Sequence, residues 1–286
     1  MGVQMSNPIV AVTGANGYIG RHVIEKLKLA GARVVALDLS RPNDDGGVQW
    51  KCADILSDDL DCSGLFDVVP DTLVHLAWRN GFKHDAPTHL GDLSAHYRFI
   101  CKMNDMGVNH VVGMGTMHEI GYWEGAINEN TPCNPQSLYG ISKDALRRAL
   151  EFERTRRGFC FQWLRGFYIY GDDERAQSIF GKLLRAAHAG QKTFPFTTGK
   201  NLYDFTTVDE LSEMIAAVSM QEDVVGTINC CSGEPISLAE RAERFITDNR
   251  LDIRLDYGAY PDRPYDSPGV WGDATKIRQV LSLAEK

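Results

Sequence analysis

The sequence contains no long apolar run, and this absence sets the first limit on the class of protein. Its apolar stretches, such as residues 9–12 and 111–112, are far shorter than the roughly 20 residues that a membrane-spanning helix needs. The first residues also lack the basic start and the apolar segment of a secretion signal. We therefore expect a cytoplasmic protein with no membrane partner.

Metal-type cysteine spacing and an excess of positive charge are missing as well. The cysteines number seven; Cys230 and Cys231 are adjacent, and Cys52 and Cys62 are ten positions apart. This pattern favours reduced thiols and no metal site. The net charge of −8 argues against nucleic acid as a partner. It leaves room for a small anionic substrate, which needs only a few basic groups or a helix N-terminus.

What is present is an ordinary globular composition, with 43% hydrophobic and 24% charged residues, in a chain long enough for one large domain and a smaller lobe. Apolar strand-like segments alternate with amphipathic helical segments. The pattern predicts strands over 8–12, 32–37, 72–77, 109–114 and 161–165, and helices over 18–30, 89–106 and 138–156. This alternation predicts an α/β fold with a doubly wound parallel sheet of the Rossmann type.

The alternation weakens beyond Gly171. The pattern there predicts helices over 175–190, 208–219 and 238–249, a strand over 226–230 and a proline-rich loop over 260–272. We predict a dinucleotide-binding domain over 1–171, to which residues 202–231 return. Residues 172–201 and 232–286 are expected to form a small, discontinuous C-terminal cap that binds the substrate.

A glycine-rich turn lies between the first predicted strand and helix. Glycines there permit a tight turn and let a pyrophosphate approach backbone N–H groups at the helix N-terminus. The strand–turn–helix context is the one that a dinucleotide-binding turn requires. Asp38 ends the second strand, where a carboxylate accepts hydrogen bonds from ribose hydroxyls; a solvated carboxylate is the alternative. This residue favours NAD, although the nearby Arg41 leaves NADP open. The residues of the turn are Gly14, Asn16, Gly17, Tyr18 and Ile19.

Tyr139 and Lys143 are four residues apart in a predicted helix, so their side chains share one face. A phenol is a poor acid or base at neutral pH, and a neighbouring ammonium is expected to bring its pKa closer to neutrality. Lys143 is also placed to hold the nicotinamide ribose. The spacing occurs often by chance, so it gains meaning only from its surroundings.

Those surroundings resemble the extended short-chain dehydrogenase/reductase family, also called the NAD-dependent epimerase/dehydratase family. The resemblance rests on the glycine turn, the Tyr/Lys pair and three further stretches, residues 75–77, 203–209 and 229–238. It implies that Thr116 holds the reacting oxygen beside the Tyr139 hydroxyl, and that the enzyme is a homodimer acting on a nucleotide sugar. It also implies that the cofactor contacts further residues, namely Asp54, Ile55, Leu76, Ala77, Tyr139 and Lys143.

The residues after Thr116 reduce the number of reactions that the resemblance allows. Met117 and His118 stand where the dehydratases of the family have an acidic pair, and a thioether cannot transfer protons, so we argue against dehydration. Glu119 is expected to point away from His118 if the segment stays extended. Reduction of a nucleotide-linked 4-keto-6-deoxy sugar, with Tyr139 as the proton donor, is favoured. A 4-epimerase with the same residues, or a non-catalytic dinucleotide-binding regulator, is the alternative.

Several residues are candidates for binding the substrate. His118 is either a second acid or base or a histidine that lines the cleft. Trp78 and Arg79 follow the strand over 72–77, at the edge where ligands bind in open α/β sheets; each has a packing or solvated role as its alternative. The resemblance adds a looser set from the end of the 161–165 strand and the cap, consisting of Tyr168, Phe194, Lys200, Tyr203 and Arg263.

Overall fold

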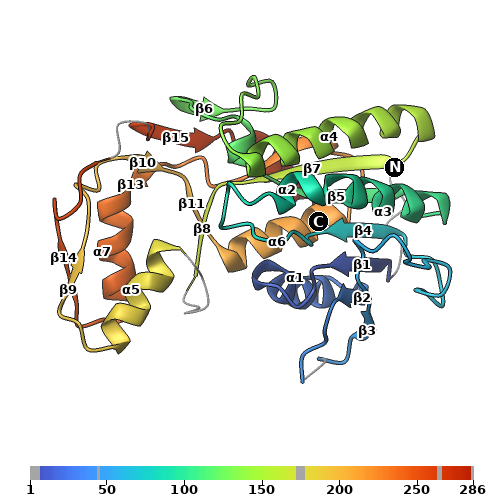
Figure 1. Ribbon diagram of the computed structural model, residues 1–286, viewed down its shortest axis with the longest axis horizontal. Helices are drawn as coiled ribbons and strands as arrows, with labels where there is room; N and C mark the ends of the chain where they lie inside the picture. The colour runs from blue at the N-terminus through green and yellow to red at the C-terminus, as the bar shows by residue number, and fades with distance from the viewer. Residues whose placement is uncertain (1–6, 44–45, 172–177, 263–265, 285–286) are drawn as a thin grey trace.

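The computed structural model describes residues 7–43, 46–171, 178–262 and 266–284. Its centre is a seven-stranded parallel sheet with the order β12-β7-β5-β4-β1-β2-β3 (Figure 1). The predicted α/β fold with a parallel sheet is therefore confirmed. The strands of this sheet are β1 (Ile9–Thr13), β2 (Arg33–Asp38), β3 (Gln49–Cys52), β4 (Thr72–His75), β5 (His110–Thr116), β7 (Cys160–Gly166) and β12 (Gly226–Cys230).

Helices cover both faces of the sheet because its central strands are apolar on both sides. On β1, Val10 and Val12 belong to one buried cluster and Ile9 and Ala11 to the other. The first cluster packs under α1 (Tyr18–Leu29), α6 (Val208–Ser219) and α8 (Thr275–Ala284). The second packs under α3 (Leu93–Asp105) and α4 (Leu138–Arg157). The strand order reverses between β1 and β4, which is the point where such sheets bind ligands.

A second group of elements lies at one end of the molecule (Figure 1). It contains α5 (Ile179–His188), α7 (Leu238–Asp248) and the two-stranded sheet of β9 (Thr193–Pro195) and β14 (Arg254–Asp256), which share a separate buried cluster. Residues 232–286 are not all in this group, because Ile277 and Val280 of α8 join the cluster beneath α1 and α6. The predicted domain boundaries otherwise stay a prediction.

Short strands connect the two parts. One sheet joins β13 (Ile236–Ser237), β10 (Leu202–Tyr203), β15 (Gly269–Gly272) and β6 (Gly125–Ile127). Another joins β11 (Phe205–Thr207) to β8 (Tyr168–Tyr170). Asp204, fully buried between β10 and β11, accepts hydrogen bonds from the backbone N–H groups of Ser232, Gly233 and Gly272. The stretches 203–209 and 229–238, which look unrelated in the sequence, are thus held together by one carboxylate.

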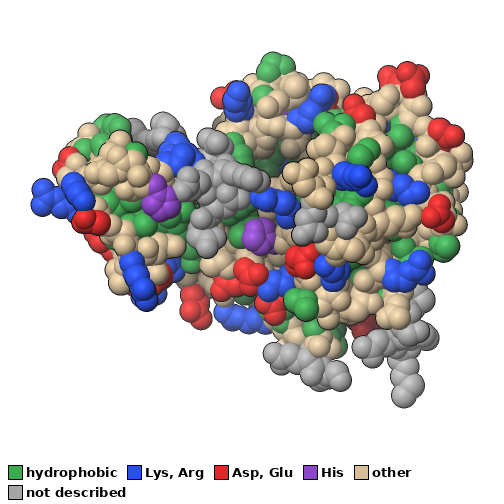
Figure 2. Space-filling view, turned by 90° about the horizontal axis from the view of Figure 1, so that it is seen from below, with side chains coloured by type: hydrophobic (Ala, Val, Ile, Leu, Met, Phe, Trp, Pro, Cys, Tyr) green, Lys and Arg blue, Asp and Glu red, His purple; other side chains and the backbone are tan. Residues whose placement is uncertain are grey.

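The remaining helices are short. The predicted helix over 89–106 is divided into α2 (Thr88–Gly91) and α3, and a single 3₁₀ turn, η1 (Met117–Glu119), follows β5. Within the described ranges, no helix combines the length and apolar character that crossing a bilayer requires. On the face shown in Figure 2, Lys and Arg side chains are interspersed with Asp and Glu.

Candidate active site

The glycine turn between β1 and α1 leaves the N-terminus of α1 without a side-chain cap. Gly14 has a φ of +66°, and a Cβ at this position would lie 2.7 Å from the backbone nitrogen of Ala77. A Cβ at Gly20 would lie 2.2 Å from the Gly14 carbonyl oxygen. Only glycine fits at these two positions. The turn therefore packs flush against the end of β4 and presents an uncapped helix N-terminus, as a pyrophosphate requires.

Asp38 lies beside this turn at the end of β2. Its Oδ2 accepts from the Asn16 N–H at 3.0 Å and its Oδ1 from the Leu39 N–H at 2.7 Å. Each oxygen retains a second lone pair that a ribose hydroxyl can use. The uncapped helix and this carboxylate fit the phosphates and ribose of a dinucleotide. The other residues predicted to contact the cofactor have different surroundings. Leu76 follows β4 beside Gly14, Ile55 is buried in the core, and Asp54 is exposed.

The structure brings Thr116, Tyr139 and Lys143 together at the carboxyl end of β5. Thr116 is the last residue of the strand, and Tyr139 and Lys143 lie in the first turns of α4. The Thr116 side chain lies close enough to the Tyr139 hydroxyl to lower the pKa of the phenol. Lys143 is 3% exposed, and its Nζ donates to the carbonyl oxygen of Met114 at 2.6 Å. The three residues that the sequence singled out thus lie near one another, and their catalytic roles stay a prediction.

The protonation of this cluster differs from the sequence-based expectation. Burial raises the pKa of Tyr139, the charge of Glu119 raises it further, and only the hydrogen bond from Thr116 lowers it. Burial lowers the pKa of Lys143 to about 7, against the attraction of Glu119. The ammonium was expected to lower the pKa of Tyr139, but it is turned toward Met114 and Trp78. Tyr139 therefore keeps its proton at neutral pH.

Trp78 forms one wall of the cluster. Lys143 Nζ lies 3.8 Å from the centroid of its ring, within the range of a cation–π interaction. The indole stacks on His96 at 4.5 Å, and its Nε1 donates to His89 Nδ1 at 2.9 Å. His96 Nδ1 is 2.9 Å from Nε2 of His75, whose other nitrogen contacts the Thr13 hydroxyl. A series of hydrogen bonds and ring contacts therefore connects Thr13, at the end of β1, to Lys143.

Two further histidines lie against Tyr139. The ring of His84 stacks on the Tyr139 ring at 5.1 Å, and His118 contacts His84 edge to face at 4.4 Å. Burial lowers the pKa of His118 to about 4, so its imidazole is neutral at physiological pH. A neutral imidazole still offers one N–H donor and one acceptor. Both histidines are therefore placed to hydrogen-bond a ligand that reaches the phenol.

The other predicted substrate residues are less concentrated. Arg79 is bound by Asp92 through two hydrogen bonds, a structural role that has no sign in the sequence. Tyr168 and Tyr203 stack on each other at 4.1 Å. Phe194 packs against the buried cluster of α5 and α7, and Lys200 is exposed. Arg263 lies outside the described residues.

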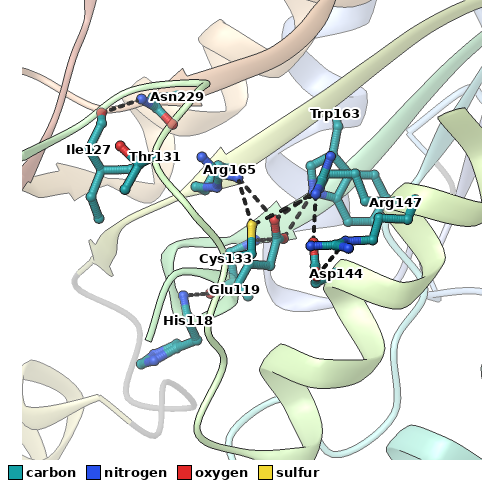
Figure 3. A network of polar contacts seen from close by, with 12 residues as sticks. His118, Glu119, Ile127, Thr131, Cys133, Asp144, Arg147, Trp163, Arg165 and Asn229 are labelled. Carbon is teal, nitrogen blue, oxygen red and sulfur yellow. Dashed lines mark hydrogen bonds and ion pairs between the residues drawn. The ribbon is translucent and has the colours of Figure 1, made fainter. Parts of the chain in front are cut away.

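Sequence reasoning missed several residues of the site. His84, His89 and His96 come from the segment after β4, and Trp163 and Arg165 come from β7. A signal for the histidines existed, since six of the eight in the chain lie within residues 75–118. Glu119 was considered only as a dehydration base. It lies in the 3₁₀ turn η1 rather than in an extended segment, and it points into the core (Figure 3).

Among the described residues, no group of three or more His, Cys, Asp or Glu side chains is arranged to hold a metal ion. The site therefore consists of a dinucleotide-type turn, a Thr/Tyr/Lys cluster and a wall of histidine and tryptophan. Such an arrangement can bind a phosphate-containing cofactor and deliver a proton to an oxygen atom beside it.

Comparison with known proteins agrees with this chemistry. Residues 10–231 match the model of the NAD dependent epimerase/dehydratase family. The dTDP-6-deoxy-L-talose 4-dehydrogenase (NAD(+)) of Aggregatibacter actinomycetemcomitans is 40% identical over 269 residues, which are 92% of this chain and 98% of the relative. Both the family match and this relative span most of the chain.

Two solved structures share the fold. The UDP-N-acetylglucosamine 4-epimerase from Methanobrevibacter ruminantium M1, in complex with UDP-N-acetylmuramic acid, has a TM-score of 0.82 and 21% identity over 96% of this chain and 92% of that chain. The UDP-glucose 4-epimerase of Thermus thermophilus, in complex with NAD, has a TM-score of 0.75 and 21% identity over 95% and 92%. With its glycine turn, its catalytic-type cluster and these matches, the chain belongs to the NAD-dependent epimerase/dehydratase family, and its relatives include nucleotide-sugar epimerases, dehydrogenases and reductases.

Proposed function

We propose that this enzyme reduces a nucleotide-linked 4-keto-6-deoxy sugar with NADH, and that Tyr139 donates the proton. The observation that carries the proposal is that Thr116 ends β5 beside Tyr139, with Lys143 one turn further along α4 on the same face. A protonated hydroxyl would then lie at the edge of the sheet where the glycine turn also opens.

The residues divide the work of the reaction. NADH, when bound, supplies the hydride for the C4 carbonyl carbon. The Tyr139 hydroxyl gives its proton to the C4 oxygen, which becomes the new alcohol, and leaves a phenolate. The Thr116 hydroxyl donates a hydrogen bond to that phenolate, and the ammonium of Lys143 stabilises its charge. The phenolate then regains its proton from solvent before the next turnover.

Two observations favour reduction over epimerisation. The 40% identical relative is named as an NAD(+)-dependent 4-dehydrogenase of a 6-deoxy sugar bound to dTDP, a reaction with net hydride transfer rather than epimerisation. In addition, burial raises the pKa of Tyr139, so the phenol carries its proton at neutral pH, as a proton donor must.

The proposal includes the cofactor and the assembly. Asp38 supports a preference for NADH, because its carboxylate would repel a 2′-phosphate. Pairing of two copies through α3 and α4, where Ile141 and Phe152 are exposed, is part of the same proposal. His118 is proposed to hydrogen-bond the sugar, and Tyr168 and Tyr203 to contact it from the far side of the site.

The test is a turnover assay with dTDP- and UDP-linked 4-keto-6-deoxy sugars, following NADH and NADPH oxidation and identifying the product by NMR. We expect one NADH consumed for each alcohol formed. Tyr139→Phe should lose about 10²- to 10⁴-fold in kcat, whereas Tyr122→Phe, at an exposed tyrosine, should not. Product without net consumption of NADH would favour an epimerase. No turnover, with function unchanged in Tyr139→Phe, would favour a regulator.

A further inference from the structure

Glu119 is a fully buried carboxylate, with 0% of its surface exposed, three residues after Thr116. Its Oε1 accepts from the Thr116 N–H at 2.8 Å and from the Trp163 Nε1–H at 2.9 Å. Its Oε2 lies 3.4 Å from Arg165 Nη2 and 3.8 Å from Arg147 Nε (Figure 3). All four neighbours are donors, so the arrangement suits an ionised carboxylate and offers nothing to a protonated one.

The sequence makes room for this group by omitting two side chains from β5. A Cβ at Gly113 would lie 2.7 Å from the Trp163 ring, and a Cβ at Gly115 would lie 2.1 Å from Trp163 Nε1 and 2.4 Å from Glu119 Oε1. The indole of β7 therefore crosses the neighbouring strand β5 to reach the carboxylate. A charge buried in this way is destabilising unless several partners compensate it, so a role beyond closing one 3₁₀ turn is expected.

The carboxylate acts on the site by two routes. Through the Thr116 N–H it fixes the backbone of the residue whose hydroxyl faces Tyr139, while the His118 N–H donates to that hydroxyl at 3.3 Å. Through its charge it raises the pKa of both Tyr139 and Lys143. Burial raises the pKa of Glu119 itself, and the two arginines with the Thr116 and Trp163 hydrogen bonds offset this only in part.

The other groups around Lys143 do not supply a counter-charge. His75 of β4 and His96 of α3 are buried, and burial keeps both neutral by lowering their pKa, to about 3 for His96. The carbonyl of Met114 and the ring of Trp78 are uncharged. Among the described residues, Glu119 is therefore the negative charge that acts on this amine.

We propose that Glu119 is a positioning residue of this site, which holds Thr116 in place for Tyr139 and keeps the amine of Lys143 charged. The part of this inference that concerns turnover rests on the proposed function. The part that concerns the charge of Lys143 does not, because the protonation of Lys143 can be measured in the enzyme without substrate.

Two substitutions separate the two routes. Glu119→Gln keeps the shape and an acceptor for the Thr116 N–H but removes the charge, so the alkaline limb of kcat/KM should move to lower pH by about one unit. Glu119→Asp keeps the charge but is one methylene shorter. It should lower kcat by about 10- to 100-fold, with KM and the position of the alkaline limb unchanged. Trp163→Phe, which removes one donor and leaves the carboxylate, should lower kcat less and also leave the limb in place.

The matched control is Glu153→Gln, because Glu153 is a buried carboxylate on α4, the helix that carries Lys143, and is bound by Tyr97 and Arg157. Titration of Lys143 by NMR of lysines labelled with ¹³C at Cε, assigned with Lys143→Met, gives the readout that needs no turnover. Its midpoint should fall in Glu119→Gln and stay in Glu119→Asp and Glu153→Gln. An unchanged midpoint in Glu119→Gln, an equal shift in Glu153→Gln, or an unchanged kcat in both Glu119→Asp and Trp163→Phe would overturn the inference. A shifted midpoint in an enzyme that reduces no sugar would instead count only against the proposed function.

Discussion

The amine of Lys143 lies 3.8 Å from the centroid of the Trp78 ring, and the same indole stacks on His96. A desolvated ammonium over an aromatic face gains on the order of 2 kcal/mol. In a site where burial lowers the pKa of Lys143 to about 7, this gain decides how much of the amine is charged at neutral pH.

Replacing the ring should therefore change the pH profile. Trp78→Leu removes the aromatic face, so the pKa of Lys143 should fall and the alkaline limb of kcat/KM should move to lower pH by roughly one unit. Trp78→Phe keeps a face and should move it less. The profiles of the three enzymes, measured under one set of salt conditions, check this. Equal shifts in both variants would mean that packing, and not the cation–π contact, holds the amine.

Two histidines of the site should make the protein sensitive to acid. Burial lowers the pKa of His118 to about 4 and of His96 to about 3, from an unfolded value of 6.5. Below pH 6.5 the unfolded chain therefore binds more protons than the folded one. The contribution of the two neutral histidines to the unfolding free energy is complete above pH 6.5 and is lost as the pH falls toward 4 and 3.

The measurement compares urea unfolding of the wild type and of His118→Asn at pH 7 and pH 4.5. The loss of unfolding free energy between the two pH values should be about 2 kcal/mol smaller in the variant. Equal losses would mean that His118 already takes up its proton in the folded state, and that other groups cause the acid sensitivity.

The groove in β5 that accepts Trp163 should not tolerate a methyl group. Gly115→Ala places a Cβ 2.1 Å from the indole nitrogen, so the indole and Glu119 must both shift. We expect a loss of about 1–3 kcal/mol of unfolding free energy, together with reduced kcat. Gly64→Ala, at a glycine with no atom within 4 Å of its added Cβ, is the control for both measurements.

Cofactor choice should depend on Asp38. Asp38→Ser removes the carboxylate that accepts from the Asn16 N–H, and with it the repulsion of a 2′-phosphate. The ratio of kcat/KM for NADPH to that for NADH should rise about tenfold. A matched substitution of the exposed Asp59 should leave the ratio unchanged. If the ratio is unaffected by Asp38→Ser, another residue selects the cofactor.

Much of the fold could be predicted because its signal is local. The unit of β1, α1 and β2 and the long helix α4 lie within one or two residues of their predicted bounds, since apolar periodicity and glycine mark them directly. The strand β3 was missed because its residues are largely exposed and carry no apolar run. The strand β15 was missed inside a proline-rich loop because its pairing with β6 joins residues that are far apart in the chain.

The candidate site, too, could be predicted only where its signal is local in the sequence. The spacing of Tyr139 and Lys143 is fixed by one helix, so it could be predicted from the sequence, and Thr116 followed from the resemblance to the family. The place of Glu119 in the site could not be predicted, because its burial depends on two glycines in β5 and on an indole from β7. The histidine wall depends on the path of the segment after β4, which no periodicity encodes.

The most direct measurement follows deuterium from NADH labelled at the transferred C4 position into the product of a nucleotide-linked 4-keto-6-deoxy sugar. A reductase that uses Tyr139 as its proton donor must place one deuterium on C4 of the new alcohol for each NADH oxidised, and Tyr139→Phe must slow this transfer by about 10²-fold or more. Product that carries no deuterium at C4, or transfer that persists at the wild-type rate in Tyr139→Phe, would contradict the account.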